Sequence, residues 1–142
     1  MSRATHLRSV HHNIEPAQII RYRLPVAGVV SILHRASGAL LFLLLPFVIW
    51  AFDASTRSEV GFDIVTSAVV AGIWFVPGWF VKLALLVLIG AFLLHLVAGI
   101  RHLWMDMTHS VSQVQGASSA RLALALGAVL TLALGAKLFG LY

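Results

Sequence analysis

One histidine of this chain lies where its side chain would be costly unless something binds it. His95 is the only ionisable residue between Leu83 and Ile100, in a run that is otherwise apolar or small. An ionisable side chain inside an apolar span marks a functional site by default. Imidazole is a frequent metal ligand, and a histidine often holds haem iron. Haem iron is therefore the first ligand to consider for His95.

Polar and basic residues follow His95 along the same predicted helix. At 100° per residue, His102 and Asp106 fall on the same stripe as His95. His102 lies two turns further along, about 10 Å down the helix axis. A haem standing edge-on could place its iron at His95 and its propionates near Arg101 and His102. These basic side chains would neutralise the propionates where the dielectric constant is still moderate.

An earlier segment supplies a second set of polar groups. Ser31 and Arg35 are one helical turn apart and share a face, with His34 turned about 60° to the side. A hydroxyl and a guanidinium in this arrangement can both donate to one carbonyl or carboxylate. By residue count, neither His34 nor His102 lies at the depth of His95. A six-coordinate haem would then need its second axial histidine from another chain.

The composition indicates a membrane protein. The chain has 142 residues, of which 60% are hydrophobic and 11% charged, whereas a soluble domain carries about 25% charge. Its mean hydropathy is +0.95. The net charge of +5 would suggest nucleic acid in a soluble protein, but here the charges flank apolar runs and set topology instead. The absence of cysteine excludes a disulfide framework and a Cys-ligated iron–sulfur or zinc site within this chain.

The apolar runs predict an all-α membrane protein with three transmembrane helices in one domain over residues 1–142. The expected spans are 24–52, 79–105 and 119–141, each long enough for a hydrocarbon core of about 30 Å. Residues 60–76 are apolar but carry Asp63 and are closed by Pro77, which favours a short interfacial helix in the first connection over a fourth span. The polar segment 108–118 is predicted to be a loop.

Positive charges predict the orientation. Arginines crowd the N-terminal arm and recur in the second connection, whereas the first connection holds Arg57 against three acidic residues. By the positive-inside rule the N-terminus is cytoplasmic and the C-terminus periplasmic, in a bacterial inner membrane. No secretory signal is apparent in residues 1–23; an Arg-rich transit peptide, and hence a mitochondrial inner membrane, is the alternative. The two basic clusters then share the cytoplasmic face.

Each polar residue also has a simpler interpretation. An intramembrane histidine can hydrogen-bond across a helix bundle, and Arg35 can extend to a lipid phosphate. Ser31 can bond its own helix backbone, and the basic end of the second span can be a topology signal alone. The occurrence of all four features at one membrane face favours a shared site.

Two segments carry a family resemblance. Residues 31–38, SILHRASG, resemble the first-helix motif of the cytochrome b subunit of succinate dehydrogenase, and residues 95–106, HLVAGIRHLWMD, resemble its second-helix motif. The resemblance covers roughly residues 23–106, and the third span is similar only in length and character. The N-terminal arm departs from the family at residues 11–16, HHNIEP, so its docking on a partner subunit is not carried over.

The resemblance implies roles for particular residues. His95 corresponds to the family's axial ligand of haem b, and Ser31 and Arg35 correspond to residues that hold ubiquinone. His34, Arg35 and His102 lie where the haem propionates are expected, with Arg101 beside them. The implied partners are a flavoprotein subunit with FAD, an iron–sulfur subunit, and a second small membrane anchor that supplies the other haem histidine. Succinate would be oxidised in a partner, with no catalytic residue for that step in this chain.

Three alternatives stay open from the sequence. The anchor of a fumarate reductase would use the same elements in the opposite direction. A free-standing cytochrome b would need both axial ligands within a dimer. A small membrane scaffold or transporter component would bind no haem and show no Soret absorbance.

Overall fold

The structure of this chain, a computed structural model, describes residues 23–109 and 112–141. Residues 1–22, with the 11–16 segment and three of the arginines used for orientation (Arg3, Arg8 and Arg21), lie outside the described residues. Three described helices are long and apolar enough to cross a membrane, namely α2 (Val26–Arg57), α4 (Gly78–Thr108) and α5 (Gln113–Leu138). These confirm the predicted all-α class, whereas the single domain over 1–142 stays a prediction.

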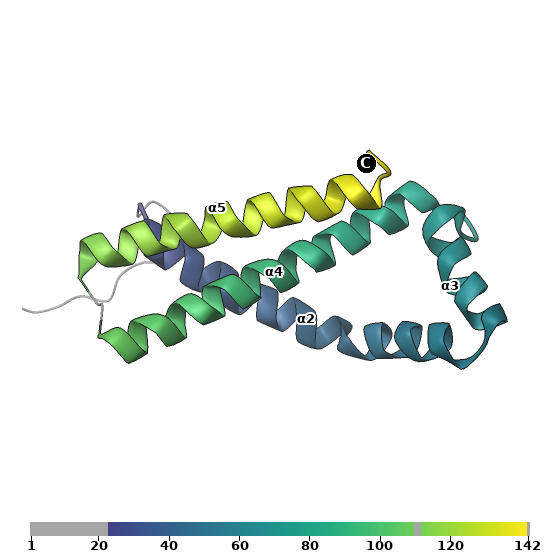
Figure 1. Cartoon of the computed structure of the whole chain (residues 1–142), viewed down its shortest axis with the longest axis horizontal. Coiled ribbons are helices and arrows are strands. Elements are labelled where there is room, and N and C mark those ends of the chain that lie inside the picture. Colours follow the sequence, from purple (N-terminus) through teal and green to yellow (C-terminus); the bar gives the residue numbers. More distant parts are fainter. Residues whose placement is uncertain (1–22, 110–111, 142) are drawn as a thin grey trace, which may run out of the picture.

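The first helix, α2, begins directly after Pro25, whose carbonyl accepts from the amides of Gly28 and Val29. It contains Pro46, which removes one backbone donor and bends a helix from within. In Figure 1, α2 first crosses α4 obliquely and then changes direction. The helix runs past the expected end at residue 52, and its last turn carries an ion pair between Asp53 and Arg57 at 2.8 Å.

The first connection contains the short helix α3 (Glu59–Val70) and a two-stranded hairpin of β1 (Gly72–Ile73) and β2 (Val76–Pro77). The Ser58 hydroxyl accepts from the amide of Gly61 and caps α3. With 12 residues, α3 is about 18 Å long and cannot cross a core of about 30 Å, so the fourth-span alternative is wrong. Trp74, at the hairpin turn, is 97% exposed, which suits a ring in the headgroup layer.

The second connection is shorter than predicted. Helix α4 continues to Thr108, and α5 begins at Gln113, so most of the segment expected to be a loop belongs to helices. Ser112 caps α5 by accepting from the amide of Gln115, and its hydroxyl donates to the side-chain oxygen of the same residue. Polar composition at these residues marks the first turn of α5 and not an irregular segment.

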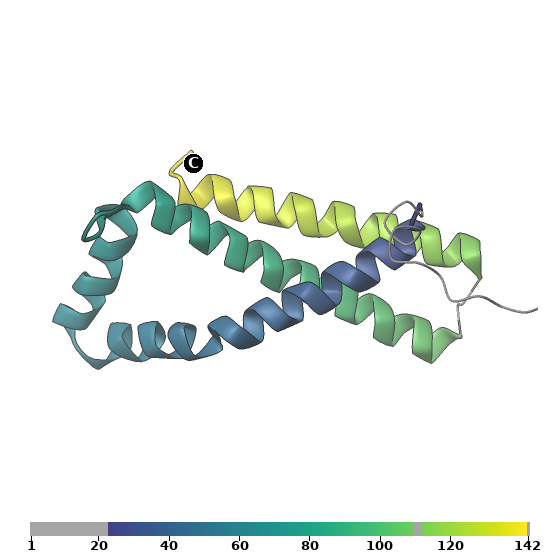
Figure 2. The ribbon, with the colours of Figure 1, turned by 180° about the vertical axis from the view of Figure 1, so that it is seen from behind.

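Small residues form the packed centre of the bundle. Val30 of α2, Ala98 of α4 and Ala120 of α5 are completely buried at one end of the molecule. In both views α5 runs along α4, while α2 passes α5 near the start of α5 and crosses α4 closer to its middle (Figures 1 and 2). Small side chains permit such close approach without a hydrophobic driving force in lipid. The start of α2, the second half of α4 around Ala98 and the start of α5 therefore pack together.

Candidate functional site

The His95 imidazole is held by the backbone of α2. Its Nδ1 lies 2.9 Å from the carbonyl oxygen of His34. A carbonyl oxygen can only accept, so Nδ1 carries the hydrogen and donates it. The lone pair of the neutral ring is then on Nε2. His95 thus presents a single nitrogen, Nε2, to a ligand.

Ser37 lies beside the same contact. Its hydroxyl donates to the His34 carbonyl at 2.9 Å, and its oxygen is 3.4 Å from Nδ1 of His95. Ser37 is one of two polar or charged residues that are buried within the described part of the chain. One carbonyl and one hydroxyl of α2 therefore surround the donor side of the His95 ring.

Three histidine rings gather at the crossing of α2 and α4. The rings of His34 and His95 are stacked, with centroids 4.1 Å apart and an angle of 5° between their planes. The ring of His102 lies 5.2 Å from that of His34, tilted by 57°. The expectation that His34 lies away from the depth of His95 is therefore wrong. Residue counts from helix ends do not include the crossing point, which places His34 between the two histidines of α4.

Glycines lie beside the histidine rings on both helices. A Cβ atom on Gly38 would lie 2.7 Å from Cε1 of His95, closer than real Cβ atoms come to other atoms. A Cβ atom on Gly99 would lie 3.4 Å from Nε2 of His34, an ordinary contact. Gly38 is thus the residue whose missing side chain leaves space for the His95 ring.

Ser31 and Arg35 lie one turn apart on α2, at the same end as the histidines. The Arg35 side chain is exposed, and its Nε donates to the backbone carbonyl of Ser31 at 3.4 Å, which is a long hydrogen bond. Ser31 is half-buried, and its hydroxyl has no hydrogen bond within the described residues. The intrahelical bond that the sequence allows for Ser31 is therefore not formed, and both side chains remain available to a ligand or a partner.

Arg101 contacts α5 and not the histidine rings. It is 8% exposed, its Nε donates to the Ser119 hydroxyl at 3.0 Å, and a terminal nitrogen donates to the Gly116 carbonyl at 3.0 Å. Both partners belong to α5. At 100° per residue Arg101 is turned about 100° from its neighbour His102, which explains why it faces the third helix. Arg101 joins α4 to α5 at the end where the histidines lie.

Sequence reasoning missed several residues that the structure brings to this end. Ser37 is a polar residue one turn from His34 in an apolar run, and that position was a usable signal. Gly38 shares a helix face with Ser31 and Arg35, and a glycine inside a helix can mark a close approach of another group. The contacts of Arg101 with Ser119 and Gly116 required the packing of α5, which no local pattern reports.

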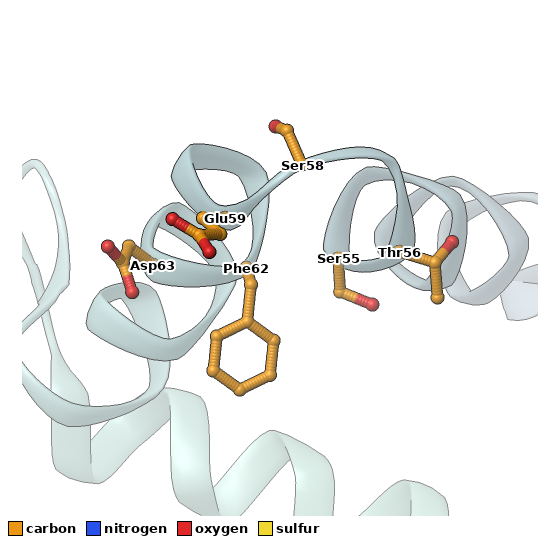
Figure 3. Close-up of a pocket in the computed structure, with 6 residues that line it drawn as sticks. All are labelled: Ser55, Thr56, Ser58, Glu59, Phe62 and Asp63. Atoms are coloured by element: carbon orange, nitrogen blue, oxygen red, sulfur yellow. The ribbon is translucent and has the colours of Figure 1, made fainter.

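A polar pocket of about 470 Å³ lies at the opposite end of the molecule, at the turn from α2 to α3. Figure 3 shows Ser55 and Thr56 of α2 on one side, Glu59 and Asp63 of α3 on the other, and the Phe62 ring between them. The α2 hydroxyls here donate to backbone carbonyls of their own helix. These two hydroxyls therefore satisfy backbone acceptors near the C-terminal end of α2.

The described residues contain no group of three or more His, Cys, Asp or Glu side chains placed to hold a metal ion. A metal held by side chains alone would need such a group. A haem differs, because its macrocycle supplies most of the iron ligands and the protein adds only the axial ones. One histidine that presents one nitrogen fits that requirement.

The chain is similar to proteins of known families. A family model described as succinate dehydrogenase/fumarate reductase transmembrane subunit matches residues 12–134. A succinate dehydrogenase cytochrome b556 subunit of Coxiella burnetii is 34% identical over 102 residues, which cover 72% of this chain and 77% of that protein. A protein of the same name from Paracoccus denitrificans is 30% identical over 108 residues, covering 76% and 77% respectively. The chain therefore belongs to the family of succinate dehydrogenase and fumarate reductase transmembrane subunits.

Proposed function

We propose that this chain is the cytochrome b anchor subunit of a succinate:quinone oxidoreductase, that it binds haem b through His95, and that it forms part of the ubiquinone site. The family and the names of the two relatives support the anchor role. The observation that carries the haem role is the hydrogen bond from Nδ1 of His95 to the His34 carbonyl. Metal-ligating histidines usually donate their second nitrogen in this way, which fixes the tautomer and raises ligand basicity.

The haem would supply one-electron transfer within the membrane. His95 would hold its iron through Nε2, and its ring is oriented for this by α2. His34, Arg35 and His102 would neutralise the propionates at the end of the bundle that is proposed to face the cytoplasm. Arg101 is not assigned to the propionates, because two of its nitrogens already donate to α5.

The second axial ligand would come from another chain. His34 would not serve as that ligand, because a haem held by both histidines would need space between their rings. The rings of His34 and His95 instead stack face to face at 4.1 Å, which leaves no room for a macrocycle. A histidine of a second small anchor subunit would complete the coordination.

The quinone would be held by Ser31 and Arg35. A hydroxyl and a guanidinium can donate to a quinone carbonyl and stabilise the negative charge that grows on its oxygen during reduction. Both residues lie at the end of the bundle proposed to face the cytoplasm, where a soluble iron–sulfur partner could deliver electrons. Succinate oxidation with FAD, and the clusters themselves, would belong to partner chains, since this chain has no cysteine.

The orientation can be tested with reporter fusions in a bacterial inner membrane. Fusions after Ser58 and after Tyr142 should report the periplasmic side, and one after His109 the cytoplasmic side, as three spans and an inside N-terminus require. A cytoplasmic signal from the Tyr142 fusion would contradict the proposed orientation.

Spectra of the assembled complex test the haem assignment. His95→Ala should lower the haem content or convert a low-spin spectrum to a high-spin one, because it removes an iron ligand. His102→Ala should shift the midpoint potential and keep the low-spin spectrum, because its role is at the propionates. His109→Asn is the matched control, since His109 is exposed, lies beyond the cluster, and has a left-handed backbone that Asn tolerates. An unchanged low-spin spectrum in His95→Ala would exclude His95 as the ligand.

The anchor of a fumarate reductase is the second candidate, because the matching family includes such subunits. The helices described here would serve either direction of electron flow. Turnover of the purified complex with succinate and ubiquinone, compared with fumarate and a low-potential quinol, distinguishes the two.

A further inference from the structure

The position of Ser37 suggests a role that the proposed haem site does not yet include. Serines of this chain often donate to a carbonyl three residues earlier in their own helix, as Ser55 does to Phe52, Ser67 to Ile64, and Ser118 to Gln115. Such a bond alone carries no functional meaning. Ser37 makes the same bond to His34 but differs in two ways. It is buried, and its oxygen also faces Nδ1 of His95 on the neighbouring helix.

The Ser37 hydroxyl and the His34 carbonyl both face Nδ1 of His95. The hydrogen on Nδ1 points mainly to the His34 carbonyl at 2.9 Å, and the Ser37 oxygen at 3.4 Å is its weaker second acceptor. The Ser37 hydrogen is directed to the same carbonyl and holds that oxygen in place. Both acceptors lie on α2, so they restrict rotation of the imidazole about its Cβ–Cγ bond.

Two further contacts restrict the ring on its other sides. Gly38 faces Cε1, where even a Cβ atom would come within 2.7 Å. The His34 ring covers one face at a centroid distance of 4.1 Å. Of these contacts, the hydroxyl of Ser37 is the one that a substitution can remove with little change of volume.

We propose that Ser37 is a positioning residue for His95, whose hydroxyl sets the plane in which the imidazole meets the haem iron. This inference rests on the proposed haem role of His95. The orientation of an axial imidazole plane affects the electronic structure of low-spin ferric haem, so its loss has a spectroscopic signature that does not depend on enzyme turnover.

The test uses electron paramagnetic resonance of the oxidised, fully assembled complex. Ser37→Ala should keep the haem content and the low-spin state but shift and broaden the signal at the highest g value. Ser37→Thr, which retains a hydroxyl, should restore a signal closer to that of the unchanged protein. Ser55→Ala is the matched control, because it removes the same intrahelical bond from α2 far from the histidines, and it should leave the signal unchanged.

The possible outcomes separate this inference from the haem proposal. A Ser37→Ala signal identical to that of the unchanged protein would overturn the positioning role, as would the same altered signal in Ser37→Thr. If Ser37→Ala does not assemble, Ser37→Cys, which preserves volume but bonds weakly, is read by the same criterion. A separate experiment tests the haem proposal: an unchanged low-spin spectrum in His95→Ala would contradict it.

Discussion

The two halves of the α2–α4 pair are built differently. At the end where α2 begins, glycines and serines let the helices touch, and polar groups bond across the gap, as His95 does to the backbone of α2. Past Pro46 the exposed side chains of α2 are large and apolar, and Phe47, Trp50 and Phe52 are each more than 65% exposed. The first half positions chemical groups, and the second presents an apolar surface to lipid or to partner helices.

Clefts between the helices follow the same division. Apolar clefts of about 420 Å³ and 310 Å³ lie between α2 and α4 along the second half, lined by leucine, valine, isoleucine, phenylalanine and alanine. Another of about 430 Å³ lies under α3 and the hairpin. The helices cross tightly only where small residues permit it. Close packing of α2 against α4 is therefore concentrated where the proposed cofactor and quinone would bind.

The largest effect is expected from the polar residues of the first half. Ser31→Ala should reduce succinate:quinone turnover by about 10²-fold, because a donor to the developing charge is lost. Arg35→Leu should act similarly and also disturb the haem spectrum, given its second proposed role. Reduction of an artificial dye by the soluble subunits should stay near normal, as should quinone turnover in Ser55→Ala at the far end. Unchanged turnover and inhibitor affinity in an assembled Ser31→Ala complex would show that the quinone does not bind at this face of α2.

The next effect comes from filling the space beside the histidine. Gly38→Ala should displace the His95 ring and weaken haem retention by about 10-fold or more, as changes to ligand-supporting contacts often do. The added Cβ would lie 2.7 Å from Cε1 of His95. Haem content after detergent extraction measures the loss. Gly28→Ala is the control in the same helix, because its nearest neighbours would be 3.7 Å away. Equal haem retention in both variants would contradict the close approach.

A smaller effect, on stability, is expected at the contact of α4 with α5. Arg101→Leu removes the two hydrogen bonds that α4 donates to the Gly116 carbonyl and the Ser119 hydroxyl of α5, and it should cost about 1–3 kcal/mol of unfolding free energy. Denaturation of the purified complex followed by circular dichroism measures it. Arg121→Leu, an exposed change on α5, should have little effect. Loss of low-spin haem at full stability in Arg101→Leu would instead assign Arg101 to the haem.

The smallest effect is expected in the second half. Asp53→Asn breaks the exposed ion pair with Arg57, whose partners are solvated and screened by salt. The haem spectrum, quinone turnover and midpoint of thermal unfolding should all match those of the unchanged complex. A shift of the haem spectrum in this variant would show that the two halves are coupled more strongly than their packing indicates.

Much of the fold could be predicted because lipid imposes it. A run of about 20 apolar residues must satisfy its backbone internally and forms a helix, so the three spans follow from composition. Helix ends were less predictable. Residues 113–118 include Gln113, Gln115 and Ser118, yet the Ser112 hydroxyl caps the helix to which they belong. Hydropathy reports the environment of a residue and says little about whether it is helical.

The sequence by itself determined the class of the protein, its spans, and the residue types that could hold a haem and a quinone. Helical periodicity puts Arg101 about 100° from His102, although both were expected near the propionates, and the packing of α5 decided that Arg101 contacts the third span. The tertiary structure decided where α2 crosses α4, and thus that the His34 carbonyl and Ser37 face the donor nitrogen of His95. The physical reason is that periodicity gives the direction of each side chain around its own helix, whereas the crossing depth depends on which small residues of two helices fit together.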